Sequence, residues 1–179
     1  MTYLIRPMKE KDIDQIMGIE SVSFGTHHWS KQSFRSELRN KTGSYYVLCD
    51  GDAEKVIGYS GFWLIMDESH ITTIAIHPDY RRKNLGELLL QNLIEKSIMR
   101  KAKWITLEVR TSNIGAQNLY YKYGFSSLGV RRKYYQDNDE DALIMWTEDI
   151  HSMKFKELFQ QNVEELKPKL DSEYKFVKG

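Results

Sequence analysis

The residues best suited to bind an anion lie in a basic turn between an apolar run and a leucine-rich run. Pro78 ends the apolar run, because proline cannot donate to a sheet ladder. Apolar residues then recur at helical spacing from Leu85, which predicts a helix that begins near Asn84. The first turn of a helix carries unpaired N–H groups and positive dipole charge, so a phosphate would fit beside basic residues 81–83 and the small Gly86. A solvated basic loop is an equally good interpretation of this stretch taken alone.

A second group of candidate residues belongs to the next strand-like run and the helix predicted after it. Glu108 stands between two apolar residues, so alternation turns its side chain to the other sheet face, where a carboxylate could enter a cleft. An ordinary polar-face glutamate fits the same alternation. Tyr120 could be a core aromatic residue or could present its hydroxyl to the cleft. Asn113 suits the N-cap of the predicted helix, and its amide could also contact a ligand.

Together these stretches resemble the GCN5-related N-acetyltransferase (GNAT) superfamily. The spacing Arg81-x-x-Asn84-x-Gly86 is similar to the Gln/Arg-x-x-Gly-x-Gly/Ala loop of that family, with asparagine in place of the first glycine. Asparagine reaches the left-handed backbone region at a small cost. Residues 113–125 resemble the second half of the family signature, and residues 130–145 resemble its bacterial ribosomal-protein-alanine N-acetyltransferase (RimI) subgroup.

The resemblance implies acetyl-CoA as the acetyl donor. In the family, the strand before the basic turn pairs with the pantetheine arm, and the turn wraps the pyrophosphate. Carried over position by position, the implied acetyl-CoA contacts are Ile74, Ala75, Ile76, Arg81, Arg82, Lys83, Asn84, Leu85, Gly86, Glu87 and Asn113. No metal is implied, and the adjacent His27 and His28 have no second cluster of ligands nearby in the sequence.

The resemblance also implies Glu108 as general base and Tyr120 as general acid. A peptide α-amine has a reference pKa of about 7.7–8.0, so at neutral pH most of it must lose a proton before it attacks a thioester. A carboxylate could accept that proton, directly or through a water, if partial burial raised its pKa. A tyrosine hydroxyl, with a reference pKa of about 10, stays protonated and could protonate the leaving thiolate.

The acceptor implied by the resemblance is the α-amine of a protein N-terminus, such as an N-terminal alanine of a small-subunit ribosomal protein. Substrate contacts are predicted for Tyr134 and Tyr135 in the last predicted hairpin and for Trp29, which could instead be a packing residue. The hairpin turn at residues 136–141 is acidic and would favour basic peptides if it faces the groove. A solvated turn is the alternative. Alternative functions are acetylation of a small amine or lysine, and non-catalytic binding of acyl-CoA.

Periodicity and turn signals predict a mixed α/β chain with one sheet. The predicted strands cover residues 3–7, 45–50, 56–66, 70–76, 104–110, 125–135 and 142–148. The predicted helices begin near residues 11, 31, 85, 113 and 151. The resemblance implies a single twisted, mostly antiparallel sheet with a central splayed parallel pair and helices on both faces. We expect the first strand at the sheet edge.

The chain of 179 residues, 41% of them hydrophobic, suits one main domain. The resemblance covers roughly Leu4 to Ile150, so we predict an acetyltransferase domain over residues 1–150 and a C-terminal helical extension with a frayed end over residues 151–179. A formal net charge of +1 argues against general nucleic-acid binding. No apolar run suits a membrane span, and we expect a cytoplasmic protein. The oligomeric state is open, with a monomer favoured.

Overall fold

The computed structural model describes residues 2–25, 28–51, 55–170 and 173–177, so His27 lies outside the described residues. The helices are α1 (Ile13–Phe24), α2 (Lys31–Arg39), α3 (Leu85–Met99), α4 (Ile114–Lys122) and α5 (Met153–Leu166), with short 3-10 helices η1 (Glu10–Asp12), η4 (Pro78–Tyr80) and η5 (Lys167–Lys169). The strands are β1 (Thr2–Pro7), β2 (Gly43–Asp50), β3 (Lys55–Ile65), β4 (Glu68–Ile76), β5 (Trp104–Arg110), β6 (Phe125–Tyr135), β7 (Glu140–Thr147) and β8 (Glu173–Phe176). No helix within these ranges is long and apolar enough to cross a membrane.

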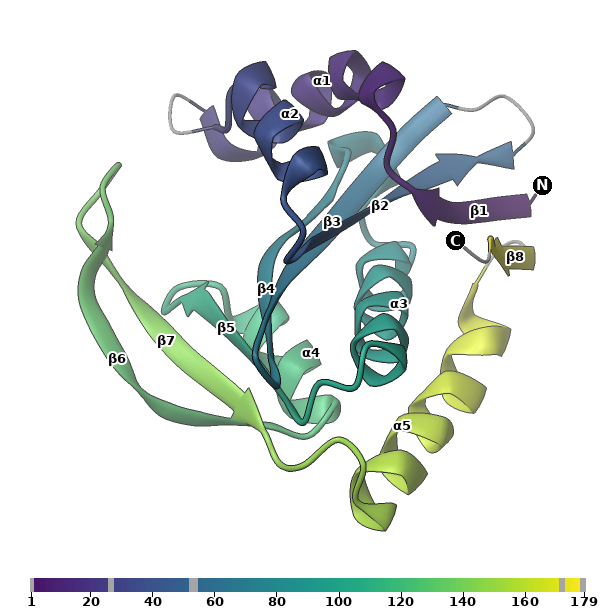
Figure 1. The fold of residues 1–179 in the computed structure, drawn as a ribbon, viewed down its shortest axis with the longest axis vertical. Coiled ribbons are helices and arrows are strands. Elements are labelled where there is room, and N and C mark those ends of the chain that lie inside the picture. Colours follow the sequence, from purple (N-terminus) through teal and green to yellow (C-terminus); the bar gives the residue numbers. More distant parts are fainter. Residues whose placement is uncertain (1, 26–27, 52–54, 171–172, 178–179) are drawn as a thin grey trace.

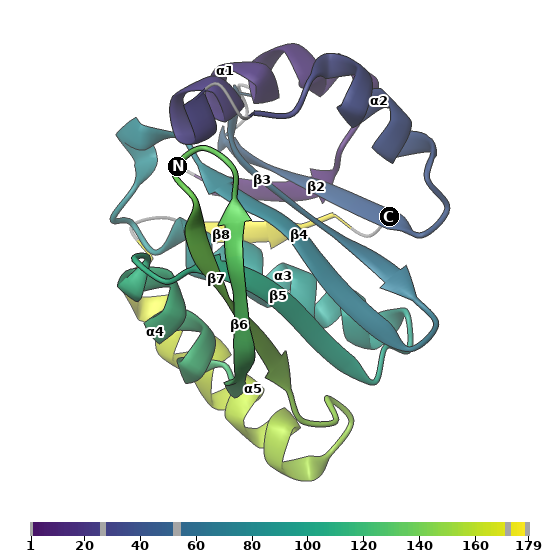
Figure 2. The ribbon, with the colours of Figure 1, turned by 90° about the vertical axis from the view of Figure 1, so that its left-hand side faces the viewer.

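The strands form one mixed sheet in the order β6-β7-β5-β4-β3-β2-β1-β8 (Figures 1 and 2). Most neighbouring strands are antiparallel, whereas β4 with β5 and β1 with β8 are parallel. Both β4 and β5 lie inside the sheet, with antiparallel neighbours on their outer sides. The predicted single, mostly antiparallel sheet with a central parallel pair is confirmed.

The central pair separates after a short stretch of pairing. The parallel ladder between β4 and β5 ends at His70 and Thr106, and beyond it β5 pairs with β7. On its other side, β4 carries Thr72 as an extra residue that the ladder with β3 skips. Such a bulge bends the strand that holds it, and here it lies at the point where β4 leaves β5. The predicted splay is therefore confirmed, and it opens the sheet at its centre.

Helices cover both faces of the sheet, as predicted. Helices α1 and α2 lie over one face and α3, α4 and α5 over the other (Figures 1 and 2). On the first face, Ile16 and Phe34 pack with Tyr59 in one apolar cluster. On the second face, Leu88 and Leu93 of α3 are fully buried against the strands. Burial of apolar area on both faces holds the two halves of the splayed sheet together.

One expectation for the chain ends is wrong. Strand β1 is not at the sheet edge, because β8 pairs with it in parallel. Near the C-terminus, Val177 N–H donates to the carbonyl of Ile5, and the rings of Tyr174 and Phe176 lie 5.4 Å apart. Without β8, the edge of β1 that faces away from β2 would have unpaired backbone groups, and β8 pairs with that edge. The apolar side chains that alternate along β8 pack into the neighbouring core. Helix α5 occurs as predicted and buries Leu166.

Candidate active site

A cavity of about 440 Å³ opens where β4 and β5 diverge, and we call it the splay cavity. Side chains from α1, β4, β5, α4 and the β6–β7 hairpin line it. Glu108 of β5 and Tyr120 of α4 are both among them. The splay of the sheet therefore brings together the two residues predicted as base and acid.

Glu108 is held by His70 and Arg131. Its side chain is 7% exposed, and its Oε2 lies 2.7 Å from Nε2 of His70. The guanidinium of Arg131 lies 3.4 Å from Oε1. Burial raises the pKa of the Glu108 carboxyl, but the hydrogen bond and charge of His70, with the charge of Arg131, outweigh it, so that the pKa lies below its usual value. The expectation of a raised pKa is therefore wrong, because the sequence did not show these partners.

His70 is a site residue that the sequence analysis missed. It pairs in register with Thr106, two residues before Glu108 on the same face of the neighbouring strand. Its ring also lies edge-on to Trp63, with 6.3 Å between ring centres. The sequence signal for His70 was a histidine within a predicted strand. Only the parallel register of β4 and β5 shows that its partner is the carboxylate of Glu108.

Tyr120 lines the same cavity as Glu108 and lies among apolar neighbours. Its ring packs against Phe125, with centres 5.6 Å apart. Burial, assisted by the nearby hydroxyl of Tyr135, raises the pKa of Tyr120 to about 12. The hydroxyl therefore stays protonated at neutral pH and can donate to a group in the cavity.

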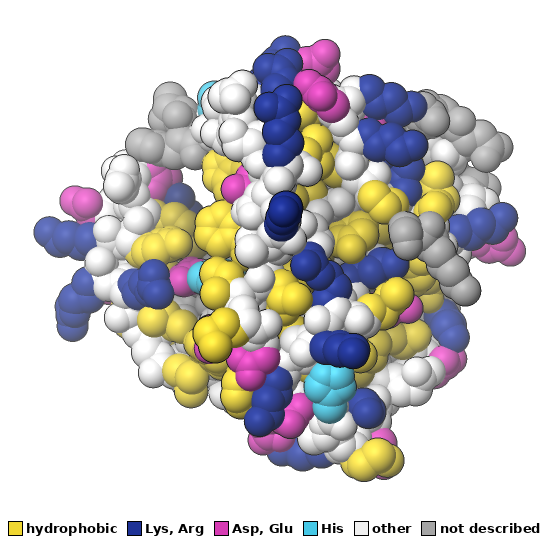
Figure 3. All heavy atoms as spheres, in the orientation of Figure 1, with side chains coloured by type: hydrophobic (Ala, Val, Ile, Leu, Met, Phe, Trp, Pro, Cys, Tyr) yellow, Lys and Arg dark blue, Asp and Glu magenta, His cyan; other side chains and the backbone are white. Residues whose placement is uncertain are grey.

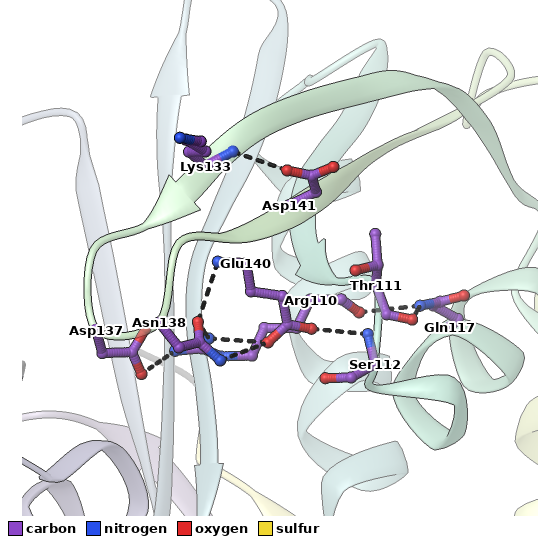
Figure 4. A network of polar contacts seen from close by, with 9 residues as sticks. All are labelled: Arg110, Thr111, Ser112, Gln117, Lys133, Asp137, Asn138, Glu140 and Asp141. Carbon is purple, nitrogen blue, oxygen red and sulfur yellow. Dashed lines mark hydrogen bonds and ion pairs between the residues drawn. The ribbon is translucent and has the colours of Figure 1, made fainter.

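Arg110 ties the β6–β7 hairpin to the end of β5 (Figure 4). Its guanidinium contacts Asp137 at 2.8 Å, and both Glu140 and Asn138 at 3.1 Å. It also lies 3.9 Å from the ring centre of Tyr135. We call these five residues the hairpin clamp. Because the clamp fixes the hairpin across β5, it holds the hairpin side chains at the mouth of the splay cavity.

Most acidic side chains of the turn at residues 136–141 have partners within the fold. Glu140 accepts the backbone N–H of Ser112 at 2.8 Å as well as Arg110, and these partners lower the pKa of Glu140 to about 2. Asp141 accepts the backbone N–H of Lys133 at 2.8 Å. Asp137 lines the cavity, but it is paired with Arg110. Much of the negative charge of the turn is therefore paired within the fold. This pairing argues against the turn as the feature that attracts basic peptides.

The predicted substrate residues fall in two different places. Tyr134 and Tyr135 line the splay cavity, with their rings 5.1 Å apart. Trp29 is not among the residues that line it, and packs against Phe34 and Tyr45 at ring-centre distances of 5.3 and 6.2 Å. The structure therefore gives Trp29 the packing position that the sequence left open.

A second cavity, of about 490 Å³, lies between the basic turn and α4, and we call it the loop cavity. Arg81, Arg82, Asn84, Leu85, Gly86 and Glu87 line it from one side, and Gly115, Ala116 and Leu119 from the other. Asn84 is the N-cap of α3 and has a φ of 59°, and Arg82 has a φ of 63°. Both left-handed residues turn the loop sharply so that the first turn of α3 faces the cavity. The basic turn that the sequence suggested as an anion cradle therefore lines a concave site.

The predicted cofactor residues contribute to this cavity in different ways. Arg81 donates to the carbonyl of Ile76 at 3.1 Å and to the hydroxyl of Ser23 at 3.2 Å, so its side chain braces the loop. The carboxylate of Glu87 accepts Lys122 at 2.6 Å and Tyr123 at 2.7 Å, which offsets its charge near a phosphate. Lys83 is not among the lining residues. Figure 3 shows Lys and Arg side chains interspersed with acidic and apolar ones on one face of the molecule.

Strand β4 connects the two cavities. Ile74 lines the splay cavity and Ile76 lines the loop cavity, with Ala75 buried between them. Past His70, this part of β4 has left β5, so the edge of β4 that faces β5 is free to pair with an extended ligand. Asn113 lines the splay cavity, and its side chain caps α4 by accepting the N–H of Ala116 at 3.2 Å, as predicted. A long ligand could lie along β4 with one end in each cavity.

The splayed sheet therefore carries one cavity beside a carboxylate that could accept a proton and another at a helix N-terminus that suits an anion. The chain belongs to the acetyltransferase (GNAT) family, whose model matches residues 13–125. It is an N-acetyltransferase of that family. Among the described residues, no group of three metal-ligating side chains occurs.

Relatives and solved structures agree with this assignment. A Bacillus subtilis protein provisionally named a ribosomal protein bS18-alanine N-acetyltransferase is 44% identical over 142 residues, which span 79% of this chain and 93% of that protein. The Escherichia coli ribosomal protein bS18-alanine N-acetyltransferase is 35% identical over 119 residues, or 65% of this chain and 78% of the relative. A crystal structure of the Escherichia coli enzyme superposes with a TM-score of 0.73 and 31% identity, and covers 81% of this chain and 92% of that one.

Proposed function

We propose that this protein transfers acetyl from acetyl-CoA to the α-amine of a protein N-terminus, with an N-terminal alanine of ribosomal protein bS18 as the first acceptor to test. The observation that carries the proposal is that Glu108 and Tyr120 line one cavity, which β4 joins to the loop cavity. The names of the Bacillus subtilis and Escherichia coli relatives support the acceptor.

The loop cavity suits the pyrophosphate end of the donor. Arg82 adds charge beside the free N–H groups of the first turn of α3. At Gly86 an added Cβ would find its nearest neighbour, a side-chain carbon of Ile76, at 4.0 Å, so the backbone there is open to close approach. Beyond this loop, the free edge of β4 at residues 74–76 offers N–H and C=O groups to the amides of the pantetheine arm.

Glu108 is the proposed proton acceptor, directly or through a water. Its lowered pKa keeps the carboxylate ionised at neutral pH, so it is ready to accept. Only the neutral fraction of the α-amine has the lone pair that attacks, so the first proton leaves the α-ammonium to solvent, at a reference pKa of about 7.7–8.0. Once its bond to the acetyl carbon forms, the nitrogen is positively charged and far more acidic, and its second proton is the one that Glu108 accepts. Glu108 therefore takes the proton as the attack proceeds, and His70 acts as a positioning residue that holds its carboxylate.

Tyr120 is the proposed donor to the leaving sulfur. Its pKa of about 12 lies above the reference value of about 8.5 for a thiol, so complete transfer of its proton to a thiolate is uphill. Its hydroxyl would first stabilise the developing thiolate as a hydrogen-bond donor. The apolar setting beside Phe125 strengthens that bond, because little water competes for it.

The test uses the full chain, acetyl-CoA and three acceptors. The first is a peptide with the N-terminal sequence of ribosomal protein bS18 and a free α-amine, the second is the same peptide with a blocked α-amine and an internal lysine, and the third is a polyamine. Mass spectrometry of the products locates the acetyl group. We expect acetylation of the first peptide at its α-amine. Faster acetylation of the lysine or polyamine would contradict the proposal, and binding of CoA without transfer to any acceptor would indicate a binding module.

A further inference from the structure

The chain continues past the matched family region through the β6–β7 hairpin into α5, η5 and β8, and we call these last three elements the C-terminal strap. Helix α5 runs beside α3, and the strap then returns to β1 at the far side of the sheet (Figure 1). Phe155 and Leu166 are buried, at 4% and 0% exposure. Helix α5 is therefore packed into the core, and two connections link the strap to the loop cavity.

The first connection is made by the residue that departs from the family motif. The side-chain amide of Asn84 donates to the backbone carbonyl of Lys169 at 3.1 Å. Glycine at this position would reach the φ of 59° without cost, but it has no side chain that could donate to the strap. Asparagine also tolerates the left-handed conformation, and it adds the connection. The departure from glycine thus coincides with a contact to a segment outside the matched family region.

The second connection is a buried chain of hydrogen bonds. Tyr123 donates to Glu87 at 2.7 Å, and Gln91 donates to both the Tyr123 hydroxyl at 2.7 Å and the carbonyl of Asn162 at 3.2 Å. The side-chain amide of Asn162 donates to the carbonyl of Lys122 at 2.9 Å. Gln91 and Asn162 are each 3% exposed. Helix α5 is therefore bonded to α3 and to the end of α4, which form opposite walls of the loop cavity.

We propose that the C-terminal strap is an accessory part of the acetyl-CoA site, with Asn84 as a positioning residue that joins it to the pyrophosphate loop. The strap holds the loop and the two wall helices at the spacing that the phosphates require. The inference rests on the proposed function. Because coupling between two sites is reciprocal, CoA bound in the loop cavity must also stabilise the docking of β8 on β1.

The first experiment removes the connection at Asn84. The variant Asn84→Gly keeps the left-handed backbone and deletes the donor amide, and calorimetry compares its binding of CoA and of pantetheine, which lacks the pyrophosphate. We expect CoA affinity to fall about 3- to 10-fold, the usual effect of one lost hydrogen bond, with pantetheine affinity unchanged. Lys101→Gly is the matched control, because Lys101 is also left-handed, with a φ of 62°, and lies in the turn after α3. Unchanged CoA affinity in Asn84→Gly would overturn the proposal.

The second experiment tests coupling between the loop cavity and the docking of β8 on β1. If glycine merely loosened the loop, this coupling would not be seen. Amide hydrogen exchange of residues 173–177 is measured with and without saturating CoA. In the wild-type chain we expect CoA to slow this exchange, and in Asn84→Gly we expect the slowing to shrink. Exchange in β8 that does not respond to CoA would overturn the strap proposal. If the wild-type chain bound no CoA at all, the proposed function would fail instead, so the two failures are distinguishable.

Discussion

The two cavities of this enzyme are built on opposite plans. The loop cavity is formed largely by one contiguous segment, residues 81–87, and offers mainly backbone groups and the end of a helix dipole. The splay cavity takes side chains from five elements. It depends on the pairing of Glu108 with His70 and of Arg110 with Asp137. A site made of backbone tolerates changes of side chain so long as space is kept. A site made of paired side chains depends on each partner, because removal of one leaves the other uncompensated.

The largest effect expected is in the splay cavity, from Glu108→Gln. Loss of the proton acceptor should lower kcat/KM for the acceptor peptide about 10²- to 10⁴-fold and leave the affinity for CoA nearly unchanged. Steady-state kinetics and calorimetry give the two quantities. Full activity near pH 7 would show that Glu108 has a structural role only.

The matching change in the loop cavity is Gly86→Trp, which should fill the space and weaken acetyl-CoA binding on the order of tenfold or more, equivalent to about 1.4 kcal/mol. Gly86→Ala is the control, because the nearest atom to an added Cβ is 4.0 Å away and alanine also favours the helix. Calorimetric titration with CoA distinguishes the two. Equal loss in both variants would mean that backbone geometry, and not space, limits the site.

A smaller effect is expected when the hairpin clamp is broken. Arg110→Ala removes the guanidinium that contacts Asp137 and Glu140 and should let the hairpin move, raising the KM for the acceptor peptide about tenfold with little change in CoA affinity. Arg110→Lys should recover part of this loss, because it keeps the charge but not the fork geometry. A change in CoA affinity as large as the change in peptide KM would contradict a role confined to the splay cavity.

The smallest effect expected is a shift in pH dependence. In the wild-type chain, His70 and Arg131 together outweigh burial and hold the pKa of Glu108 below its usual value. His70→Gln removes the charge, so burial should raise the pKa of Glu108, and the acid limb of kcat/KM should move to higher pH. Activity above pH 8 should change little, since Glu108 is ionised there in both chains. Profiles from pH 5 to 9 test this, with His151→Gln as control, because His151 instead contacts the carbonyl of Ala102 at 2.8 Å. An acid limb at the same pH in the wild-type chain and in His70→Gln would show that His70 does not influence the pKa of Glu108.

Local patterns in the chain were enough to predict most elements and the wall of the loop cavity formed by the basic turn and the start of α3, but not the opposite wall at α4. Pro78, the basic turn and the leucine spacing are adjacent in sequence, and a helix N-terminus binds anions through local geometry alone. For the same reason, the left-handed backbone expected at Asn84 and the cap at Asn113 occur where they were predicted.

Tertiary structure decided the features that depend on strand register and on packing between distant segments. The partner of Glu108, and hence the direction of its pKa shift, follows from the parallel register that sets His70 beside it. The hairpin acids were visible, but their neutralisation by Arg110 was not. The docking of β8 depends on the free edge of β1, at the opposite end of the chain. Register and edge pairing are properties of two segments at once, so no pattern within one segment can specify them.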